Sequence, residues 1–485
     1  MSSKKRRKTK HPEAVLTCAL LASAVPASQA ADAVAGARAF DDGAATASPE
    51  SFVSESGQPV PPAAATMNGG GGSLGGEVLS GSAGEFALYN TTLPKAVFGT
   101  FWAAGGGTAQ KAFIYDDLTC DIDAVTGANG GACVGPDGGK NNTVDYALAE
   151  DTLTASQISS WATSSFGQAA AGNLIQIPAF GIAPAIVVND TNITKNGELE
   201  LTDNDLCGIY SGLITDFSQI TDTTSKPAPG QFQLVYRTDA NGLSFLLTNH
   251  LNAVCNTGNT QAGVTFTATP TFAGVFSGSI NTWIPNAIGE VGDAGVANYL
   301  SGLSDGAVPQ AIGYTSTGWT SLYPDSQTAL SNGAHSELLV AALKNGGAKF
   351  QPTYQNVAKG LLSPVAGTGE NLTPPANAEQ GANPALWVPV TPEVATGYPI
   401  VGYTQFVLTQ CYSSAAVGKG VVAFLKDHYG NKAYDTIQNA NGFVTLKAVT
   451  GNGFLTAIED NILANDNSWN TDIHDATVCS GLEGR

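Results

Sequence analysis

Residues 235–251 read Val-Tyr-Arg-Thr-Asp-Ala-Asn-Gly-Leu-Ser-Phe-Leu-Leu-Thr-Asn-His-Leu. The apolar start predicts a short strand that ends at Arg237, and the small polar residues after it predict the start of a helix. Free N–H groups at a helix start favour negative charge, and a guanidinium beside them adds charge-assisted hydrogen bonds. The segment therefore predicts an anion site in which Asp239 holds Arg237. The alternative interpretation is an ordinary surface pair of arginine and aspartate.

The order strand, Arg-x-Asp-x-x-Gly, helix resembles the phosphate-gripping segment of periplasmic phosphate-binding proteins, and the chain is most similar to their DING branch. These proteins are the soluble receptors of ABC phosphate importers. Four further segments carry the resemblance: Asn-Gly-Gly-Gly-Gly-Ser-Leu at 68–74, Leu-Cys-Gly-Ile-Tyr-Ser-Gly-Leu-Ile-Thr-Asp-Phe at 206–217, Gly-Tyr-Pro-Ile-Val-Gly-Tyr at 397–403 with Gln-Cys-Tyr at 410–412, and Thr-Val-Cys-Ser-Gly at 477–481. One departure is Thr66-Met67, which stands where the family has Asp-Ile.

The resemblance implies an α/β fold of the type II periplasmic-binding-protein kind. Such a fold has two lobes of mostly parallel sheets flanked by helices, with the ligand cleft between the lobes. Ligands of open α/β sheets bind in crevices outside the strand ends, which agrees with a cleft site. We expect lobe one to contain residues 67–181 and 397–485, and lobe two to contain residues 182–396.

Local patterns support this organisation. Apolar, β-branched runs at 174–178 and 185–188 are typical of buried strands, and they mark the crossing between the lobes. Apolar residues also recur every four positions on a predicted helix that ends near Gly430: Val417, Val421, Leu425 and Tyr429.

The resemblance further implies which residues contact the ligand. Ser73 and Leu74 stand where the family has a threonine and a leucine, and they offer a hydroxyl and backbone amides. Arg237 matches the family's arginine. Asn241 and Gly242 match a serine and a glycine at the helix start.

Other positions depart from the family. Gly106 stands where the family has a serine, and Thr108 is the candidate to replace that hydroxyl. Leu243 replaces a threonine that donates to the ligand, which leaves only its N–H group. The acidic residue that accepts the proton of hydrogen phosphate, and so rejects sulfate, aligns with Glu150, or with Asp151 if the alignment shifts by one.

Charge limits the classes of partner. The first 30 residues carry six Lys or Arg and one acidic residue, so the remainder has 15 basic and 39 acidic residues and a net charge of −24. A body this acidic argues against nucleic acid and against an anionic membrane surface as partners.

The first 30 residues have the pattern of an export signal. A basic stretch at 4–8 precedes an apolar run at 14–25 and a small-residue end, Ser28-Gln-Ala30. Residues 31–66, rich in Ala, Ser and Pro, are predicted to form a flexible leader. We expect no membrane span after cleavage, and a location in the periplasm of a bacterium or outside the cell.

Removal of the signal leaves six cysteines, which allow fifteen pairings, and sequence alone does not choose among them. An oxidising compartment favours bridges. The resemblance implies that Cys207 pairs with Cys255 and Cys411 with Cys479, which leaves Cys120 with Cys133. The spacing does not support a zinc cluster, because no Cys-x-x-Cys pair is present.

Residues 71–75 fit the Gly-x-Ser-x-Gly pattern of a hydrolase nucleophile. We interpret the match as coincidental, because no apolar strand is predicted before it and no helix after it. The histidines show no metal-binding spacing, so no metal and no cofactor is predicted.

The sequence therefore predicts an exported, monomeric receptor that closes its two lobes over inorganic phosphate or a related oxyanion, with an ABC importer as the membrane partner. The first alternative is a secreted DING-type alkaline phosphatase acting on phosphomonoesters, for which the sequence shows no evident catalytic residues. The second is a secreted scaffold whose pocket has lapsed.

Overall fold

A computed structural model describes residues 65–91, 97–121, 143–221, 223–302, 310–324, 338–388, 390–466 and 468–485. All of them belong to one compact unit, residues 42–485. The predicted export signal, nearly all of the leader, and Cys133 lie outside the described residues. Among the helices of the described part, none is both long and apolar enough to cross a membrane.

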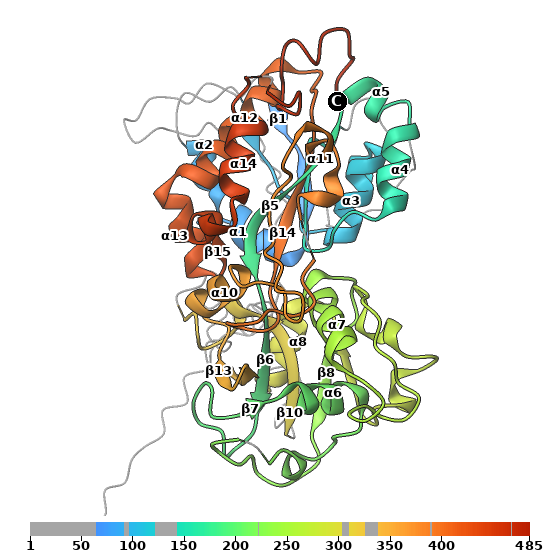
Figure 1. Cartoon of the computed structure of the whole chain (residues 1–485), viewed down its shortest axis with the longest axis vertical. Coiled ribbons are helices and arrows are strands. Elements are labelled where there is room, and N and C mark those ends of the chain that lie inside the picture. Colours follow the sequence, from blue (N-terminus) through green and yellow to red (C-terminus); the bar gives the residue numbers. More distant parts are fainter. Residues whose placement is uncertain are drawn as a thin grey trace, which may run out of the picture. The chain divides into compact units, whose positions relative to one another are not determined.

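Two five-stranded sheets organise the chain (Figure 1). In spatial order, the first sheet contains β15 (Val444–Thr445), β5 (Leu174–Ile182), β14 (Gly402–Thr409), β4 (Tyr146–Ala149) and β2 (Gly69–Gly71). The second contains β11 (Leu339–Val340), β6 (Pro184–Asn189), β10 (Ala311–Ser316), β8 (Gln233–Arg237) and β9 (Ile288–Glu290). We call each sheet with its helices a lobe, and number the lobes in this order.

The two predicted buried runs are strands of different sheets. β5 lies in the first sheet and is buried along its whole length, and β6 begins two residues later in the second sheet. The chain returns to the first sheet in β14, which pairs with β5 in antiparallel register from Gly402 opposite Ile182 to Thr409 opposite Leu174. The described chain therefore passes from one sheet to the other and comes back.

Strand direction differs from the expectation of mostly parallel sheets. In the first sheet only β2 and β4 pair in parallel. In the second sheet β8 pairs in parallel with both of its neighbours, β10 and β9. β5, β6 and β14 pair with their neighbours in antiparallel fashion. In the first sheet, the outgoing strand β5 and the returning strand β14 are antiparallel neighbours. In the second sheet, β6 runs antiparallel to both of its neighbours, β10 and β11.

Shorter strands complete the sheet structure. They are the parallel pair β1 (Ala65–Met67) and β3 (Val97–Gly99), and a three-stranded sheet of β13 (Ala348–Phe350), β12 (Ala342–Asn345) and β7 (Glu200–Leu201).

Helices belong mainly to one sheet or the other (Figure 1). The first lobe has α1 (Ser73–Leu79), α2 (Glu85–Thr91), α3 (Gly106–Tyr115), α4 (Ala155–Thr163), α5 (Gln168–Ala171), α12 (Ala415–Gly430), α13 (Lys432–Ala440) and α14 (Phe454–Asn461). The second has α6 (Asp203–Ser211), α7 (Gly242–Val254) and α8 (Gly292–Leu300), and α10 (Tyr354–Leu361) and α11 (Ala378–Gly381) follow in the chain. The 3₁₀ helices are η1 (Leu118–Cys120), η2 (Phe217–Gln219), η3 (Phe272–Val275), η4 (Ile280–Thr282), η5 (Thr317–Trp319), η7 (Pro384–Leu386) and η8 (Leu446–Asn452).

Local sequence signals explain where several of these helices begin and end. Thr154 and Thr202 form reciprocal capping boxes at the starts of α4 and α6. The predicted helix with a four-residue apolar period is α12, which ends at Gly430 as expected.

α10 and η7 both contact β5, so part of segment 182–396 lies against the first sheet. Our division at 182 and 396 therefore stays a proposal.

Two disulfides join the cysteines that the resemblance paired. Cys207 bonds Cys255 at the end of α7, and Cys411 bonds Cys479. The third predicted pair joins Cys120 to Cys133, and Cys133 lies outside the described residues.

Removal of the first bridge tests its contribution to stability. The double change Cys207→Ala with Cys255→Ala is expected to lower the free energy of unfolding by about 2–4 kcal/mol, because the unfolded chain gains conformational freedom. The measurement is urea denaturation followed by circular dichroism. Ligand affinity should stay unchanged, since the bridge lies at the opposite end of α7 from Gly242.

Candidate functional site

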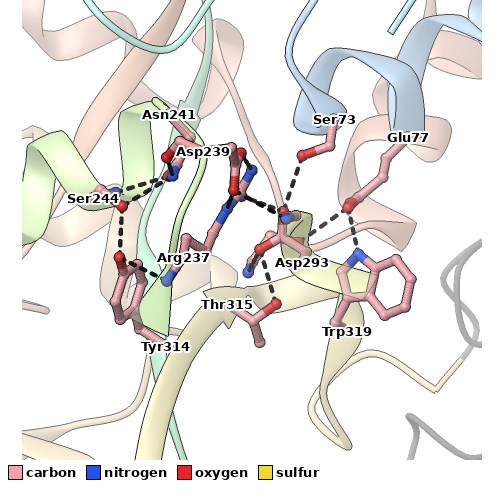
Figure 2. Close-up of polar contacts among 12 residues, drawn as sticks. Ser73, Glu77, Arg237, Asp239, Asn241, Ser244, Asp293, Tyr314, Thr315 and Trp319 are labelled. Carbon is pink, nitrogen blue, oxygen red and sulfur yellow. Dashed lines mark hydrogen bonds and ion pairs between the residues drawn. The ribbon is translucent and has the colours of Figure 1, made fainter. Parts of the chain in front are cut away.

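Arg237, at the end of β8, is buried and binds two carboxylates (Figure 2). Its Nε donates to Asp239 Oδ1 at 3.1 Å, and its Nη2 pairs with Asp239 Oδ2. Its Nη1 donates to Asp293 Oδ2 at 2.8 Å. The sequence interpretation named Asp239 as the residue that holds Arg237, and the structure adds Asp293 as a second one.

Asp293 lies in the first turn of α8 and is 1% exposed. It accepts hydrogen bonds from Thr315 Oγ1 at 2.9 Å and from Ser73 Oγ at 3.1 Å (Figure 2). It also accepts from Ser316 N at 2.9 Å. Ser73 begins α1 of the first lobe, whereas the other partners belong to the second. Asp293 therefore links the start of α1 to Arg237.

Sequence reasoning missed Asp293, although a signal for it exists. β9 ends at Glu290 and pairs in parallel with β8, so Arg237 and the residues after β9 lie at the same sheet edge. An aspartate just after a strand beside Arg237 was therefore a candidate partner, since side chains at the carboxyl ends of parallel strands converge.

The start of α7 is held by side chains. Asn241 caps the helix, because its Oδ1 accepts from Ser244 N at 2.9 Å, and its Nδ2 donates to Asp239 O and to Ser244 Oγ. Ser244 Oγ contacts Tyr314 Oη at 2.6 Å. The Asn241 amide is thus used inside the protein. The N–H groups of Gly242 and Leu243 belong to the first turn, where a helix offers no partner of its own.

Glu150, directly after β4, is 3% exposed, and three glycines pack against it. A Cβ atom added to Gly72 would lie 2.1 Å from Glu150 Oε1, and one added to Gly106 would lie 3.0 Å from Oε2. A Cβ added to Gly242 would lie 1.7 Å from the Cβ of Glu150. The starts of α1 and α3 therefore lie against the Glu150 carboxyl, and the start of α7 lies against the Cβ and backbone of the same residue.

The Glu150 carboxyl has no hydrogen-bond partner on either oxygen within the described structure. Burial raises its pKa to about 8, and the charge of Asp151 adds to the shift, whereas Arg237 opposes it. The charges of both Arg237 and Asp293 act on the Glu150 carboxyl. Because buried polar groups normally have partners, an unsatisfied carboxyl at three helix starts indicates a position for a ligand.

The other residues that the sequence placed in the site differ in where their side chains lie. Leu74 and Leu243 have buried side chains in the hydrophobic core, so only their backbone amides can serve a ligand. Asp151 contacts α3 through its carbonyl oxygen, which accepts from Gln110 Nε2 at 2.7 Å, and burial raises its pKa to about 6. Thr108 lies in the first turn of α3 and is partly exposed. The glycine contacts favour Glu150 over Asp151 as the acidic residue of the site.

The Gly-x-Ser-x-Gly match needs a correction. β2 precedes it and α1 begins at Ser73, so a strand and a helix do flank the motif. We expected neither, because glycine runs have weak strand and helix propensity; tertiary packing against β4 and Phe101 overrides that. Ser73 lacks the strained positive φ of a nucleophile elbow, and its hydroxyl donates to Asp293.

The raised pKa of Glu150 predicts a pH dependence. Below the unfolded-state pKa the group is neutral in both states, and as pH rises toward about 8 only the unfolded state ionises, so folding stability falls through this window. For one proton, the loss in the free energy of unfolding is about 1.4 kcal/mol per pH unit. Glu150→Gln is therefore expected to unfold less readily than the parent at pH 8 and similarly at pH 4. Urea denaturation at both values measures the difference, and an equal gain at both would contradict the ionisation argument.

Residues 105–362 match the family model described as the PBP superfamily domain. The chain belongs to the PBP superfamily. As a PBP superfamily protein, it is 30% identical over 416 residues to alkaline phosphatase L of Pseudomonas aeruginosa strain PAO1, covering 84% of this chain and 94% of that protein. It is 32% identical over 355 residues to a phosphate-binding protein from an unknown prokaryotic organism, covering 69% and 86%.

A solved structure shows the same fold. The periplasmic phosphate-binding protein PfluDING, bound with phosphate, aligns with a TM-score of 0.64 and 27% identity over 87% of this chain and 99% of that one. These relatives confirm that this PBP superfamily protein resembles the DING phosphate-binding proteins, as its sequence predicted.

Proposed function

We propose that the protein binds inorganic phosphate at the convergence of α1, α3 and α7, beside Glu150 and Arg237. The observation that carries the proposal is the Glu150 carboxyl, which is more than nine-tenths buried, lacks partners on both oxygens and is faced by Gly72 and Gly106, with Gly242 against the Glu150 Cβ. Tetrahedral oxyanions need several donors at short range, and backbone N–H groups at glycine-rich helix starts supply them without a side chain in the way.

The charges of the site favour a ligand that carries a proton. Arg237 is already balanced by Asp239 and Asp293, so the side chains offer no excess positive charge. A fully ionised anion would face Glu150 with no proton between them whenever Glu150 is ionised. Where Glu150 is ionised, above about pH 8 in the free protein, hydrogen phosphate can donate its proton to that carboxylate, whereas sulfate cannot. The names of the relatives that bind phosphate agree with this ligand.

The ligand contacts proposed from the sequence are now more specific. We propose backbone donation from Ser73, Leu74, Gly106, Gly242 and Leu243, with Arg237 as the charged donor and Glu150 as the acceptor. Asn241 and Asp239 support the site without contacting the ligand, because their polar side-chain atoms form hydrogen bonds within the protein. Capture in the periplasm or outside the cell, and delivery to an ABC importer, are part of the same proposal.

Calorimetric titration of the purified protein with phosphate, arsenate, sulfate and a phosphomonoester tests the proposal. We expect binding of phosphate, and weaker or no binding of sulfate. Absence of phosphate binding between pH 6 and 9 would contradict it.

Phosphatase activity is the second candidate, because relatives of similar coverage are called alkaline phosphatase L. The test is hydrolysis of a chromogenic phosphate ester. Hydrolytic activity that copurifies with the protein and is lost in Ser73→Ala would support this function. Phosphate binding without turnover would support the receptor alone.

A further inference from the structure

Glu77 is a second buried carboxyl that the proposed ligand contacts do not use. It lies one turn after Ser73 on α1 and is 8% exposed. Its Oε1 accepts a hydrogen bond from Trp319 Nε1 at 2.8 Å (Figure 2). The same oxygen accepts from Ser316 Oγ at 3.1 Å. These two donors lie on or beside η5, at the end of β10 in the second lobe.

Helix α1 therefore contacts the second lobe at two places. Ser73 contacts Asp293, and Glu77 contacts Ser316 and Trp319. Ser316 joins the two contacts, since its backbone N–H donates to Asp293 and its hydroxyl donates to Glu77. We call Glu77, Ser316 and Trp319 the clasp.

The far oxygen of Glu77 is enclosed without a partner. Glu77 Oε2 makes no hydrogen bond within the described structure, and a Cβ added to Gly318 would lie 3.0 Å from it. The backbone of Gly318 therefore packs close to this oxygen. A carboxylate oxygen in such a place is poorly tolerated, whereas a protonated one is neutral.

The charged groups that act on Glu77 are Asp293 and Arg237. Burial raises the pKa of Glu77 well above its usual range, and the negative charge of Asp293 raises it further. The hydrogen bonds from Trp319 and Ser316, and the charge of Arg237, lower it by less. Burial of the carboxyl, the lack of a hydrogen-bond partner on Oε2 and the charge of Asp293 all favour the protonated form of Glu77 while α1 contacts η5.

A ligand cannot reach the Glu150 carboxyl in this arrangement, because both oxygens are inaccessible. Gly72 and Gly106 lie against the oxygens, and Gly242 of α7 lies against the Cβ and backbone of Glu150. Entry requires α7 to separate from the first lobe, and the contact of α1 with η5 joins the same two lobes. A separated Glu77 would be exposed to water, where a carboxyl has its ordinary pKa and is ionised at neutral pH.

On these grounds we propose that Glu77 is a positioning residue that couples closure over phosphate to the uptake of one proton from solvent. The inference rests on the proposed phosphate function. The proton binds to the Glu77 carboxylate as the clasp forms, and it returns to solvent when the clasp opens. Phosphate affinity should then fall as pH rises above the ordinary pKa of a carboxyl, by up to about tenfold per pH unit for this one proton.

Glu77→Gln tests the proposal, because glutamine keeps the acceptor for Trp319 and Ser316 but cannot take up a proton. Inorganic phosphate is titrated calorimetrically at pH 6, 7 and 8 in pairs of buffers with different ionisation enthalpies, which gives the number of protons bound. We expect the variant to take up close to one proton fewer than the parent. Phosphate and Glu150 titrate equally in both proteins, so the difference isolates Glu77.

The matched control is Glu459→Gln, the same change at an exposed residue of α14, which should leave the proton count unchanged. If Glu77→Gln does not fold, Glu77→Met provides a second chain without a proton at this position. A variant with the parent's proton count would overturn the role of Glu77 while leaving the phosphate function intact. A parent protein that binds no phosphate at any of the three pH values would overturn both.

Discussion

Replacement of Arg237 by methionine is expected to lower the free energy of unfolding by about 3–5 kcal/mol, since one partner of a buried ion pair is lost. Asp293, 1% exposed, would keep its neutral donors but lose its only close cation among the described residues. Phosphate affinity should also fall by at least about tenfold, because a hydrogen bond to a charged group is worth roughly 1.5–3 kcal/mol. Urea denaturation and calorimetry measure the two effects.

The double change Arg237→Met with Asp293→Asn separates stability from binding. Neutralising Asp293 removes the unpaired buried charge, so part of the lost stability should return. Phosphate affinity should not return, because the charged donor is still absent. If Arg237→Met alone leaves the unfolding free energy unchanged, the buried pair with Asp293 does not hold the site together.

The sequence predicted the features that local pattern controls. The strand before Arg237, the helix after it, and the crossing at 182–184 all follow from apolar periodicity and cap residues that lie close together in the chain. The contact of Asp239 with Arg237 could also be predicted, because the two residues are two positions apart in the chain.

Contacts between segments far apart in the chain could not be predicted from the sequence. Asp293 and Glu77 reach their partners only after two sheets and several helices have packed, and their sequence neighbours give little indication of those partners. The flanking strand and helix of Gly71-x-Ser73-x-Gly75 were missed for the same reason: β2 consists of three glycines, and it forms because it pairs with β4. Mixed strand direction likewise depends on which strands become neighbours.

Gly242→Ala is expected to weaken phosphate binding by roughly tenfold to a hundredfold, the scale of an overpacking cost of about 1–3 kcal/mol. The added Cβ would lie 1.7 Å from the Glu150 Cβ and 2.7 Å from its Cα, so a side-chain rotation cannot relieve the clash. The start of α7 must move away from Glu150, and its N–H groups move with it. Calorimetry with phosphate measures the loss.

The direction of this effect distinguishes packing from helix propensity. Gly242 lacks a positive φ, so its backbone conformation accepts alanine, and propensity alone would favour alanine by up to about 1 kcal/mol. Gly107→Ala is the matched control, because it makes the same change in the first turn of α3, where an added Cβ meets nothing within 4 Å. Phosphate affinity should survive Gly107→Ala. If it also survives Gly242→Ala, α7 does not need to contact Glu150 for binding, and the anion must be held without the N–H groups of Gly242 and Leu243.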